Sequence, residues 1–402
     1  MSNQWWPDVS AYSEFLSPAQ IVAGRGSSAK VAELLQRRFG VRSGSVLVAI
    51  DDIVLDNGLA EPLLAGLREA GIEAVISKGF GAEPSSDVVD AAAALARTSE
   101  AQVVIGIGGG SVLDSSKLLS LLLRNEGGSA DWLGAVEPAG GVTPLLLVPT
   151  TCGTGSEATR IAMVTVDGSK RASSCALYVP DVVVIDPDLL RTLPPRVVAS
   201  TAMDALAHAV ESLMSSTHSP MSAHSAYHAI DLILGHVEAA VAGDQDAVAA
   251  CLWGSHMAGQ ALNAGVVFGH SLAYCLAHEK PMPHGVSCAL ALPYCIAYNQ
   301  QLEPQLASTL ALRLTGGRSD DLRDAAQAVL ELVRRLGLPT TLDEAQLPPD
   351  SEAAMAAQCV REYPRPTNPE PLDEAKIDRL LQSMRDGDLD AAFAVTTAEA
   401  LQ

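Results

Sequence analysis

The first half of the chain alternates short apolar runs with helical patterns, which strongly limits the folds it can adopt. The runs cover residues 46–50, 73–77, 102–107, 145–148 and 182–185. Because most are apolar throughout, without polar alternation, we expect strands buried on both faces. Such strands, separated by helices, form a parallel sheet. The pattern predicts a doubly wound α/β domain.

The pattern changes after Leu193, where Pro194 and Pro195 interrupt the chain and β-rich runs become scarce. Ala- and Leu-rich segments with helical periodicity follow, at residues 198–214, 221–241, 247–264 and 321–336. We therefore predict two domains, an α/β domain over residues 1–194 and an all-helical domain over residues 195–402.

Composition excludes several classes of protein. The net charge of −21 disfavours nucleic acid and anionic membrane surfaces as partners, because the chain would repel phosphate. The apolar runs are shorter than the roughly 20 residues that a membrane helix needs. The seven cysteines include no C-x-x-C pair, and the first ten residues have no signal-peptide pattern. We expect reduced thiols and a cytoplasmic protein.

A glycine-rich turn follows the strand predicted at residues 102–107 and opens a helix. Its backbone amides, at Gly109, Gly110 and Ser111, would lie at a helix N-terminus, which favours anions. Asp114, three residues after Ser111, gives a pattern like a capping box at the helix start. The turn is a candidate phosphate site, although its glycines could equally serve packing alone.

Two further features follow neighbouring strands. Residues 150–157 form a second turn rich in hydroxyl groups, including Thr151 and Thr154, which could bind ribose, phosphate or amide groups. Asp51 ends the first predicted strand, where a carboxylate can accept hydrogen bonds from an adenosine ribose and repel a 2′-phosphate. An ordinary Ser/Thr-rich loop and a surface acid are the alternative interpretations.

Asp204 and His208 are four residues apart, on one face of a predicted helix with nearly all-apolar surroundings. A buried carboxylate there needs a partner. With His270 and His284 they could form a cage for Zn(II), Fe(II) or Mn(II). Spacing alone does not distinguish His270 and His284 from ordinary histidines. We interpret five other histidines as hydrogen-bonded core or surface side chains: His218, His224, His228, His236 and His256.

Several motifs together resemble the iron-containing (group III) alcohol dehydrogenases. The resemblance extends from about residue 15 to about residue 384. It rests on the turn at residues 108–117, the turn at 149–157, the Pro-Asp and Asp-Pro pairs at 180–187, the Asp204–His208 helix through Glu211, and the pairs Gly269-His270 and His284-Gly285.

This resemblance implies an α/β NAD-binding domain with a parallel sheet, followed by an all-helical metal-binding domain. It makes Asp204, His208, His270 and His284 the ligands of a divalent metal, Fe(II) first, with Zn(II) or Mn(II) possible. It places Asp51 at the adenosine ribose. The other residues that it assigns to the dinucleotide site are Gly109, Gly110, Ser111, Asp114, Thr151, Thr154 and Lys170.

One position departs from the family pattern. Many members carry a further histidine four residues after the third ligand, proposed to relay a proton, but this chain has Tyr274 there. A phenol, with an unperturbed pKa of ~10, is a poor proton carrier near neutral pH. We expect Tyr274 to border the substrate and to shape the pocket more than it moves protons.

The resemblance implies an NAD-dependent, divalent-metal-dependent alcohol dehydrogenase or aldehyde reductase that transfers hydride between nicotinamide and a small alcohol or aldehyde. We also expect a homo-oligomer, a dimer or larger. An alternative is a lyase resembling the dehydroquinate-synthase-like sugar-phosphate cyclases. Such a site needs basic residues for phosphate, and Lys280 is the only lysine or arginine between Asp204 and His284. A member that has lost its metal is a third interpretation, which the intact ligand set disfavours.

Overall fold

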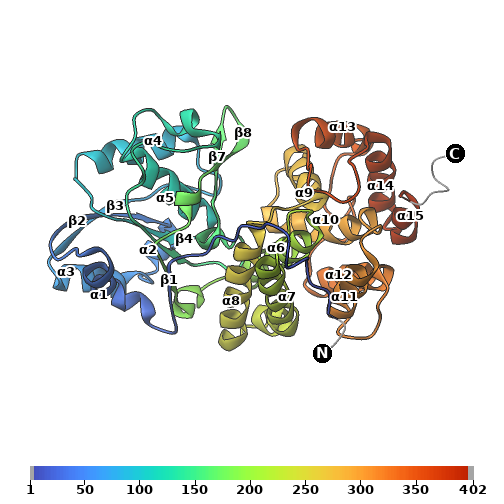
Figure 1. Cartoon of the computed structure of the whole chain (residues 1–402), viewed down its shortest axis with the longest axis horizontal. Coiled ribbons are helices and arrows are strands. Elements are labelled where there is room, and N and C mark those ends of the chain that lie inside the picture. The colour runs from blue at the N-terminus through green and yellow to red at the C-terminus, as the bar shows by residue number, and fades with distance from the viewer. Residues whose placement is uncertain (1–3, 397–402) are drawn as a thin grey trace. The chain divides into compact units, whose positions relative to one another are not determined.

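The computed structural model describes residues 4–396. Contacts divide the chain into two compact units. One is the α/β unit Leu16–Leu193, and the other is the helical unit, formed by Pro194 onward together with the segment before Leu16. Figure 1 shows the elements of both.

A six-stranded sheet, parallel throughout, forms the centre of the α/β unit. In spatial order its strands are β1 (Gln20–Ala23), β9 (Val182–Ile185), β6 (Leu145–Pro149), β4 (Val104–Gly108), β2 (Gly44–Ile50) and β3 (Ile72–Ser77). Every residue of β4, β6 and β9 is buried. The parallel sheet that the apolar runs predict is therefore confirmed.

Helices cover this sheet. They are α1 (Val31–Leu34), α2 (Asp52–Asp56), α3 (Glu61–Glu69), α4 (Ser86–Arg97) and α5 (Gly110–Leu122). α5 packs on β4 and β6 and also against α4, whereas α3 packs on β3 and α1. In Figure 1, α4 and α5 lie on one side of the sheet and α1 and α3 on the other. Shorter helical turns are η1 (Ser27–Lys30), η2 (Leu35–Phe39), η3 (Ser129–Trp132), η4 (Ser156–Ala158), η5 (Ala176–Tyr178) and η6 (Pro187–Leu190).

The strand order reverses at β2, which pairs with β3 on one side and with β4 on the other. In open α/β sheets, ligands bind outside the carboxyl ends of the strands at such a switch point. A second, three-stranded sheet of β5 (Gly134–Ala135), β8 (Ser169–Ser174) and β7 (Ile161–Val166) follows, which the sequence patterns did not predict.

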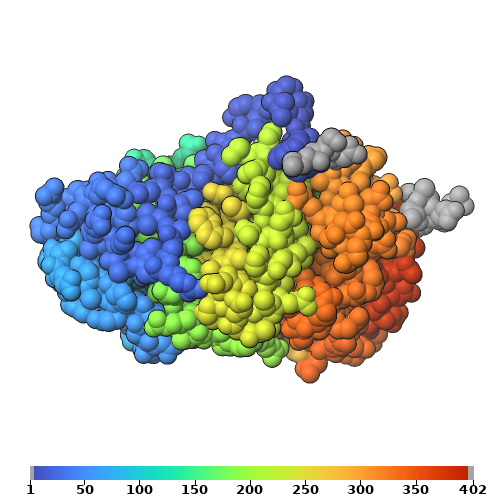
Figure 2. Space-filling model, turned by 90° about the horizontal axis from the view of Figure 1, so that it is seen from below, coloured from blue at the N-terminus to red at the C-terminus, as the bar shows by residue number. Residues whose placement is uncertain are grey.

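The helical unit surrounds α6 (Pro195–Met214), which is buried along most of its length. The others are α7 (Pro220–Val241), α8 (Gln245–Leu262), α9 (Phe268–Glu279), α10 (His284–Tyr298), α11 (Pro304–Leu314), α12 (Leu322–Arg335), α13 (Glu352–Glu362), α14 (Glu374–Asp386) and α15 (Leu389–Ala394). α6 packs against α7, α8 and α10. Figure 2 shows α7 and α8 side by side in yellow-green and yellow. No helix within residues 4–396 is both long and apolar enough to cross a bilayer.

The segment before Leu16 belongs to the helical unit, although the sequence places residues 1–194 in one domain. Its backbone is tied there by two hydrogen bonds. Trp5 N donates to Thr309 Oγ1 at 3.0 Å, and Tyr227 Oη donates to Trp5 O at 2.9 Å. Single hydrogen bonds to distant helices leave no periodic pattern in the sequence, so sequence patterns do not predict them.

Candidate active site

Most of the predicted cofactor residues lie directly after β2, β4 and β6, whereas Asp114 lies in α5 and Lys170 in β8. Asp51 N, directly after β2, donates to Ile107 O in β4 at 3.0 Å. Thr150 N, directly after β6, donates to Gly108 O at 3.0 Å. Three separate loops therefore meet at the switch point of the sheet, the position where this fold binds a dinucleotide.

The two turns lie against each other through small groups. A Cβ atom added to Gly110 would lie 2.6 Å from Thr154 Cγ2, and one added to Gly109 would lie 3.2 Å from Thr151 Cγ2. Gly110 is the first residue of α5, and no side chain caps this helix. The amides of Gly110 and Ser111 precede the first bonds inside the helix, which Val112 N and Leu113 N make to Gly109 O, so this end of α5 favours an anion.

Asp114 has a different role from the capping box that its spacing suggests, and that interpretation is wrong. Its carboxylate accepts hydrogen bonds from Ser156 Oγ and from Met163 N, the latter at 3.0 Å. Because both donors lie in the second turn and in β7, Asp114 joins α5 to the chain that follows β6.

Lys117 completes this connection from inside the protein. Its side chain is fully buried, and Nζ donates to Ser156 Oγ at 2.8 Å and to Thr159 Oγ1 at 2.9 Å. Burial lowers the pKa of Lys117, and the nearby carboxylates of Asp114 and Glu157 oppose that shift. Such a lysine stabilises the shape of the turn.

Ser111, Lys170 and Asp51 occupy the margin of the same region. Ser111 Oγ donates to Ala82 O. Lys170 Nζ lies 3.9 Å from the carboxylate of Glu83, which follows Ala82 in the chain. Asp51 Oδ1 accepts from Ile53 N at 2.8 Å and so caps α2. All the predicted cofactor residues lie in the α/β unit, and several already bond to the protein itself.

The predicted metal ligands come from three helices of the helical unit. Asp204 and His208 project from one face of α6, His270 is the third residue of α9, and His284 is the first residue of α10. The loops before α9 and α10 thus bring two distant histidines to the buried face of α6. The helix contacts α6–α9, α6–α10 and α9–α10 assemble the site.

The three imidazoles surround one carboxylate oxygen. Asp204 Oδ1 lies 3.9 Å from His208 Nε2, 3.8 Å from His270 Nε2 and 3.7 Å from His284 Nε2. Asp204 is 2% exposed, and within residues 4–396 its Oδ1 has no hydrogen-bond partner. These separations are too long for hydrogen bonds but fit ligands that share one cation. The donor atoms of Asp204, His270 and His284 therefore lie close enough together to hold one divalent metal, and His208 faces the same carboxylate oxygen.

The electrostatics of Asp204 agree with this arrangement. Burial alone would raise the pKa of Asp204, but His208, His284 and His270, with a hydrogen bond from the Cys288 thiol, outweigh burial and hold the pKa below its ordinary value. The carboxylate is thus ionised at neutral pH, as a metal ligand must be.

Glu211, to which the sequence analysis gave no role, orients His270. His270 Nδ1 donates to Glu211 Oε1 at 2.6 Å, while Oε2 accepts from the backbone amides of Val267 and His270. This contact fixes the tautomer that leaves Nε2 as an acceptor facing Asp204. The signal was present in the sequence, because Glu211 is seven residues after Asp204 and shares its helix face.

Close packing of α10 on α6 requires a glycine directly after His284. A Cβ atom added to Gly285 would lie 2.1 Å from Ser200 O of α6. Only glycine lets the start of α10 approach α6 this closely, and the approach carries His284 to Asp204. The His-Gly pair in the sequence is thus a packing requirement of the site.

Tyr274 lies beside the metal ligands. Its ring stacks on His284, with the ring centroids 5.4 Å apart and an interplanar angle of 13°. Tyr363 packs against it at 5.2 Å. Burial raises the pKa of Tyr274 to about 12, so its hydroxyl stays protonated near neutral pH.

Cys288, which the sequence patterns did not indicate, belongs with Asp204, His270 and His284 to a group of donor atoms within 4.8 Å of one another.

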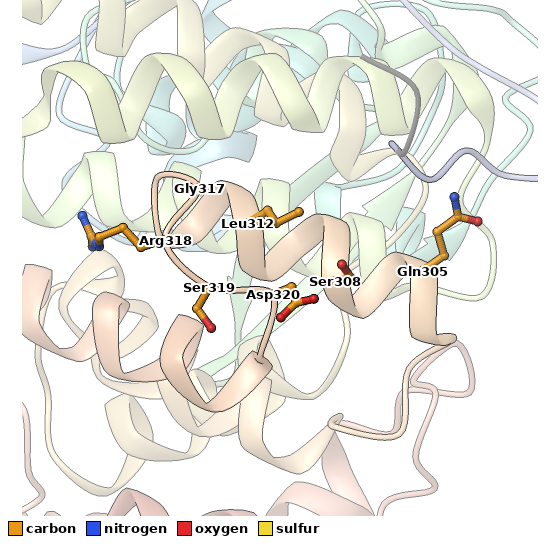
Figure 3. A pocket seen from close by; sticks show the side chains of 7 residues that line it. All are labelled: Gln305, Ser308, Leu312, Gly317, Arg318, Ser319 and Asp320. Atoms are coloured by element: carbon orange, nitrogen blue, oxygen red, sulfur yellow. The ribbon is translucent and has the colours of Figure 1, made fainter.

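A surface hollow of about 550 Å³ lies along α11 and the loop after it, lined by Leu312, Arg318 and Asp320 among others (Figure 3). None of the predicted site residues lines that hollow.

Comparison with known proteins identifies the family. The model of the iron-containing alcohol dehydrogenases matches residues 18–187, and the C-terminal model of the Fe-containing alcohol dehydrogenase family matches residues 198–385. The chain therefore belongs to the iron-containing alcohol dehydrogenase family. It is an oxidoreductase of the alcohol dehydrogenase and aldehyde reductase type, the first of the expectations above.

Individual relatives agree over nearly the whole chain. Long-chain-alcohol dehydrogenase 1 of Geobacillus thermodenitrificans is 34% identical, and the alignment covers 90% of this chain and 92% of that protein. The structure of an alcohol dehydrogenase from Oenococcus oeni is 28% identical, with a TM-score of 0.87 over 93% of this chain and all of that one. A sulfoacetaldehyde reductase from Bifidobacterium kashiwanohense, solved with NAD⁺, is 25% identical, with a TM-score of 0.85 over 94% of this chain and 99% of that one.

Proposed function

We propose that the protein uses NAD and a single divalent metal to interconvert a small alcohol and its aldehyde. The observation that carries this proposal is the buried Oδ1 of Asp204, which has no hydrogen-bond donor in the described part of the chain and faces three imidazole nitrogens. Such an arrangement is unfavourable without a cation, because a desolvated carboxylate oxygen needs a compensating partner.

Asp204, His208, His270 and His284 would hold the metal, with Fe(II) the first candidate and Zn(II) or Mn(II) the alternatives. When bound, the cation supplies a Lewis acid for the substrate oxygen, and the nicotinamide accepts or delivers the hydride. Glu211 keeps the His270 ring in its binding orientation through the 2.6 Å hydrogen bond. Tyr274 confines the space beside His284 and supplies no proton near neutral pH.

The dinucleotide would lie on the edge formed by the ends of β2, β4 and β6. The amides at the start of α5 favour its phosphates, and the threonines Thr151 and Thr154 border the same surface. Asp51 disfavours a 2′-phosphate, which supports NAD over NADP. The relative solved with NAD⁺ lends further support. Ser111, Asp114 and Lys170 support the surrounding loops.

We also propose a cytoplasmic homo-oligomer, a dimer or larger. The seven cysteines support a reducing compartment, because all are buried and none forms a disulfide.

The proposal is tested by reconstituting purified protein with Fe(II) or Zn(II) and supplying NADH with aldehydes of increasing chain length. We expect net consumption of NADH and formation of the alcohol. A cyclase uses its NAD without net oxidation, so activity without net NADH consumption would contradict the proposal. NADPH with the same aldehydes provides the control for cofactor choice.

A further inference from the structure

Arg365 is a half-buried arginine near the metal ligands, in the loop between α13 and α14. Pro364 and Pro366 flank it and restrict its backbone. Within residues 4–396, its side chain forms no hydrogen bond or ion pair, and its Nε atom is buried. A desolvated guanidinium without an acceptor is unfavourable, because its N–H groups lose water and gain no bond in return.

The other half-buried arginines of the helical unit are paired with carboxylates. Arg313 Nη1 lies 2.5 Å from Asp231 Oδ2, and Arg385 Nη1 lies 2.6 Å from Asp343 Oδ1. The chain has 47 acidic residues against 26 lysines and arginines, so carboxylates are plentiful. An arginine that is left unpaired in such a chain is placed to bind an anion that the chain does not supply.

Hydrogen bonds hold the loop of this arginine against the start of α9. Ser271 Oγ donates to Tyr363 O at 2.6 Å, and Phe268 N donates to Asn368 Oδ1 at 2.9 Å. The two donors lie on either side of the metal ligand His270 in the chain. The loop is therefore fixed relative to that ligand, as a preorganised binding group must be.

Tyr274 contacts both the arginine and the metal ligands. Its ring stacks on His284 at 5.4 Å and lies 6.2 Å from the His270 ring. The guanidinium carbon of Arg365 lies 5.9 Å from the centre of the same ring, near the outer limit of a cation–π contact, which supplies no hydrogen-bond acceptor. Because these separations are short, a molecule of a few carbon atoms can reach from the metal ligands to the guanidinium.

We propose that Arg365 binds the anionic end of the substrate, so that the enzyme acts on short aldehydes and alcohols that carry a carboxylate at their other end. The guanidinium presents parallel N–H groups to a carboxylate and forms charge-assisted hydrogen bonds with it. The net charge of −21 repels anions at long range, so such a substrate needs a local cation. This assignment rests on the proposed function and names its substrate class.

The test compares charged aldehydes with neutral ones of the same carbon chain. Metal-loaded wild type is supplied with NADH and with succinic or glutaric semialdehyde, and separately with the methyl ester of each. We expect kcat/KM to be about tenfold higher or more for the acid than for its ester, at one chain length or both.

Arg365→Gln should lower kcat/KM for the preferred acid about 10- to 100-fold, chiefly by raising KM, and change the value for its ester less than about threefold. Arg365→Lys keeps the charge without the planar fork and should recover part of the loss. Arg361→Gln, which alters an exposed arginine of α13, is the matched control and should leave both values unchanged. Circular dichroism confirms that the variants are folded.

The outcomes separate this assignment from the proposed function. Equal kcat/KM for acid and ester at both chain lengths in the wild type, with NADH consumed, would overturn the role of Arg365 and leave the proposed function intact. A loss in Arg365→Gln that is equal for acid and ester, or that lies in KM for NADH, would also overturn it. Failure of the wild type to consume NADH with charged or neutral aldehydes would contradict the proposed function, and the substrate class with it.

Discussion

The polar side chains of the candidate dinucleotide site hydrogen-bond to the protein, whereas, within the described residues, the candidate metal site contains a buried carboxylate oxygen that does not. In the α/β unit, Asp51, Ser111 and Asp114 each bond to the protein itself. In the helical unit, Asp204 Oδ1 faces three imidazoles and has no hydrogen-bond partner among the residues that the structure describes. The first site is a surface shaped by loops, whereas the second is a set of donors that requires an ion.

This contrast predicts how each site responds to mutation. Changes in the α/β unit should have graded effects, because backbone amides remain when one side chain is removed. Substitutions among the metal ligands should have large effects. Each removes one ligand of the cation and leaves the remaining ligands buried around an incompletely coordinated site. The predictions below test this difference.

The largest effect is expected for His270→Ala. Loss of a ligand should remove the metal and lower kcat/KM on the order of a thousandfold, since Lewis-acid catalysis contributes several kcal/mol. Metal content and kcat/KM are measured on protein whose circular dichroism is unchanged. His236→Ala, which alters an exposed histidine of α7, is the control and should retain metal and activity. Stoichiometric metal in active His270→Ala would remove His270 from the ligand set.

Glu211→Gln should weaken metal binding about 10- to 100-fold, because the hydrogen bond to His270 Nδ1 then lacks its charged acceptor. The measurement is the metal dissociation constant by competition with a chelator. Glu238→Gln, which weakens an exposed ion pair between α7 and Arg335 far from the ligands in sequence, is the control and should leave the metal affinity unchanged. A Glu211 variant with wild-type metal affinity would show that the 2.6 Å contact only stabilises α9.

Asp51→Asn should narrow the preference for NAD over NADP by on the order of 1–2 kcal/mol in kcat/KM. Asparagine also caps helices well, so the substitution removes charge while keeping the start of α2. Asp52→Asn, at the neighbouring carboxylate, is the control. If the wild type already prefers NADPH, Asp51 does not meet the ribose.

The smallest effect is expected for Tyr274→Phe, which keeps the ring stacked on His284. Removal of the hydroxyl should lower kcat less than about tenfold, or ~1.4 kcal/mol of barrier. The pKa of Tyr274, raised to about 12, keeps the phenol neutral below that pH, so the pH profile of kcat between about pH 6 and 9 should be unchanged. A loss beyond a hundredfold with intact metal and NAD binding would make the hydroxyl catalytic.

Features that lie within one short segment of the chain could be predicted from the sequence, whereas features built from distant segments could not. The buried strands and the glycine turn lie within short segments, so local patterns reveal them. The second sheet was not predicted, because β8 carries Lys170 and Arg171 and lacks an apolar pattern, so the apolar run of β7 had no recognisable partner strand. The Trp5 anchoring escaped because it depends on hydrogen bonds to distant helices.

The metal site shows the same limit. Asp204 and His208 could be paired from their helical spacing, but His270 and His284 needed the family resemblance, because nothing local distinguishes them from other histidines. Glu211 and Cys288 lie one or two turns from recognised ligands, at spacings that also occur by chance. Only the packing of α9 and α10 on α6 shows that these side chains converge.

The central claim is that one divalent metal at Asp204 and the three histidines supports NAD-dependent catalysis. It is tested most directly by titrating chelated, demonstrably metal-free protein with Fe(II) or Zn(II) while following NADH oxidation by an aldehyde. We predict negligible activity at the start and a rise that saturates at one equivalent of metal per chain. Full activity in the metal-free protein, unchanged on addition of metal, would contradict the account.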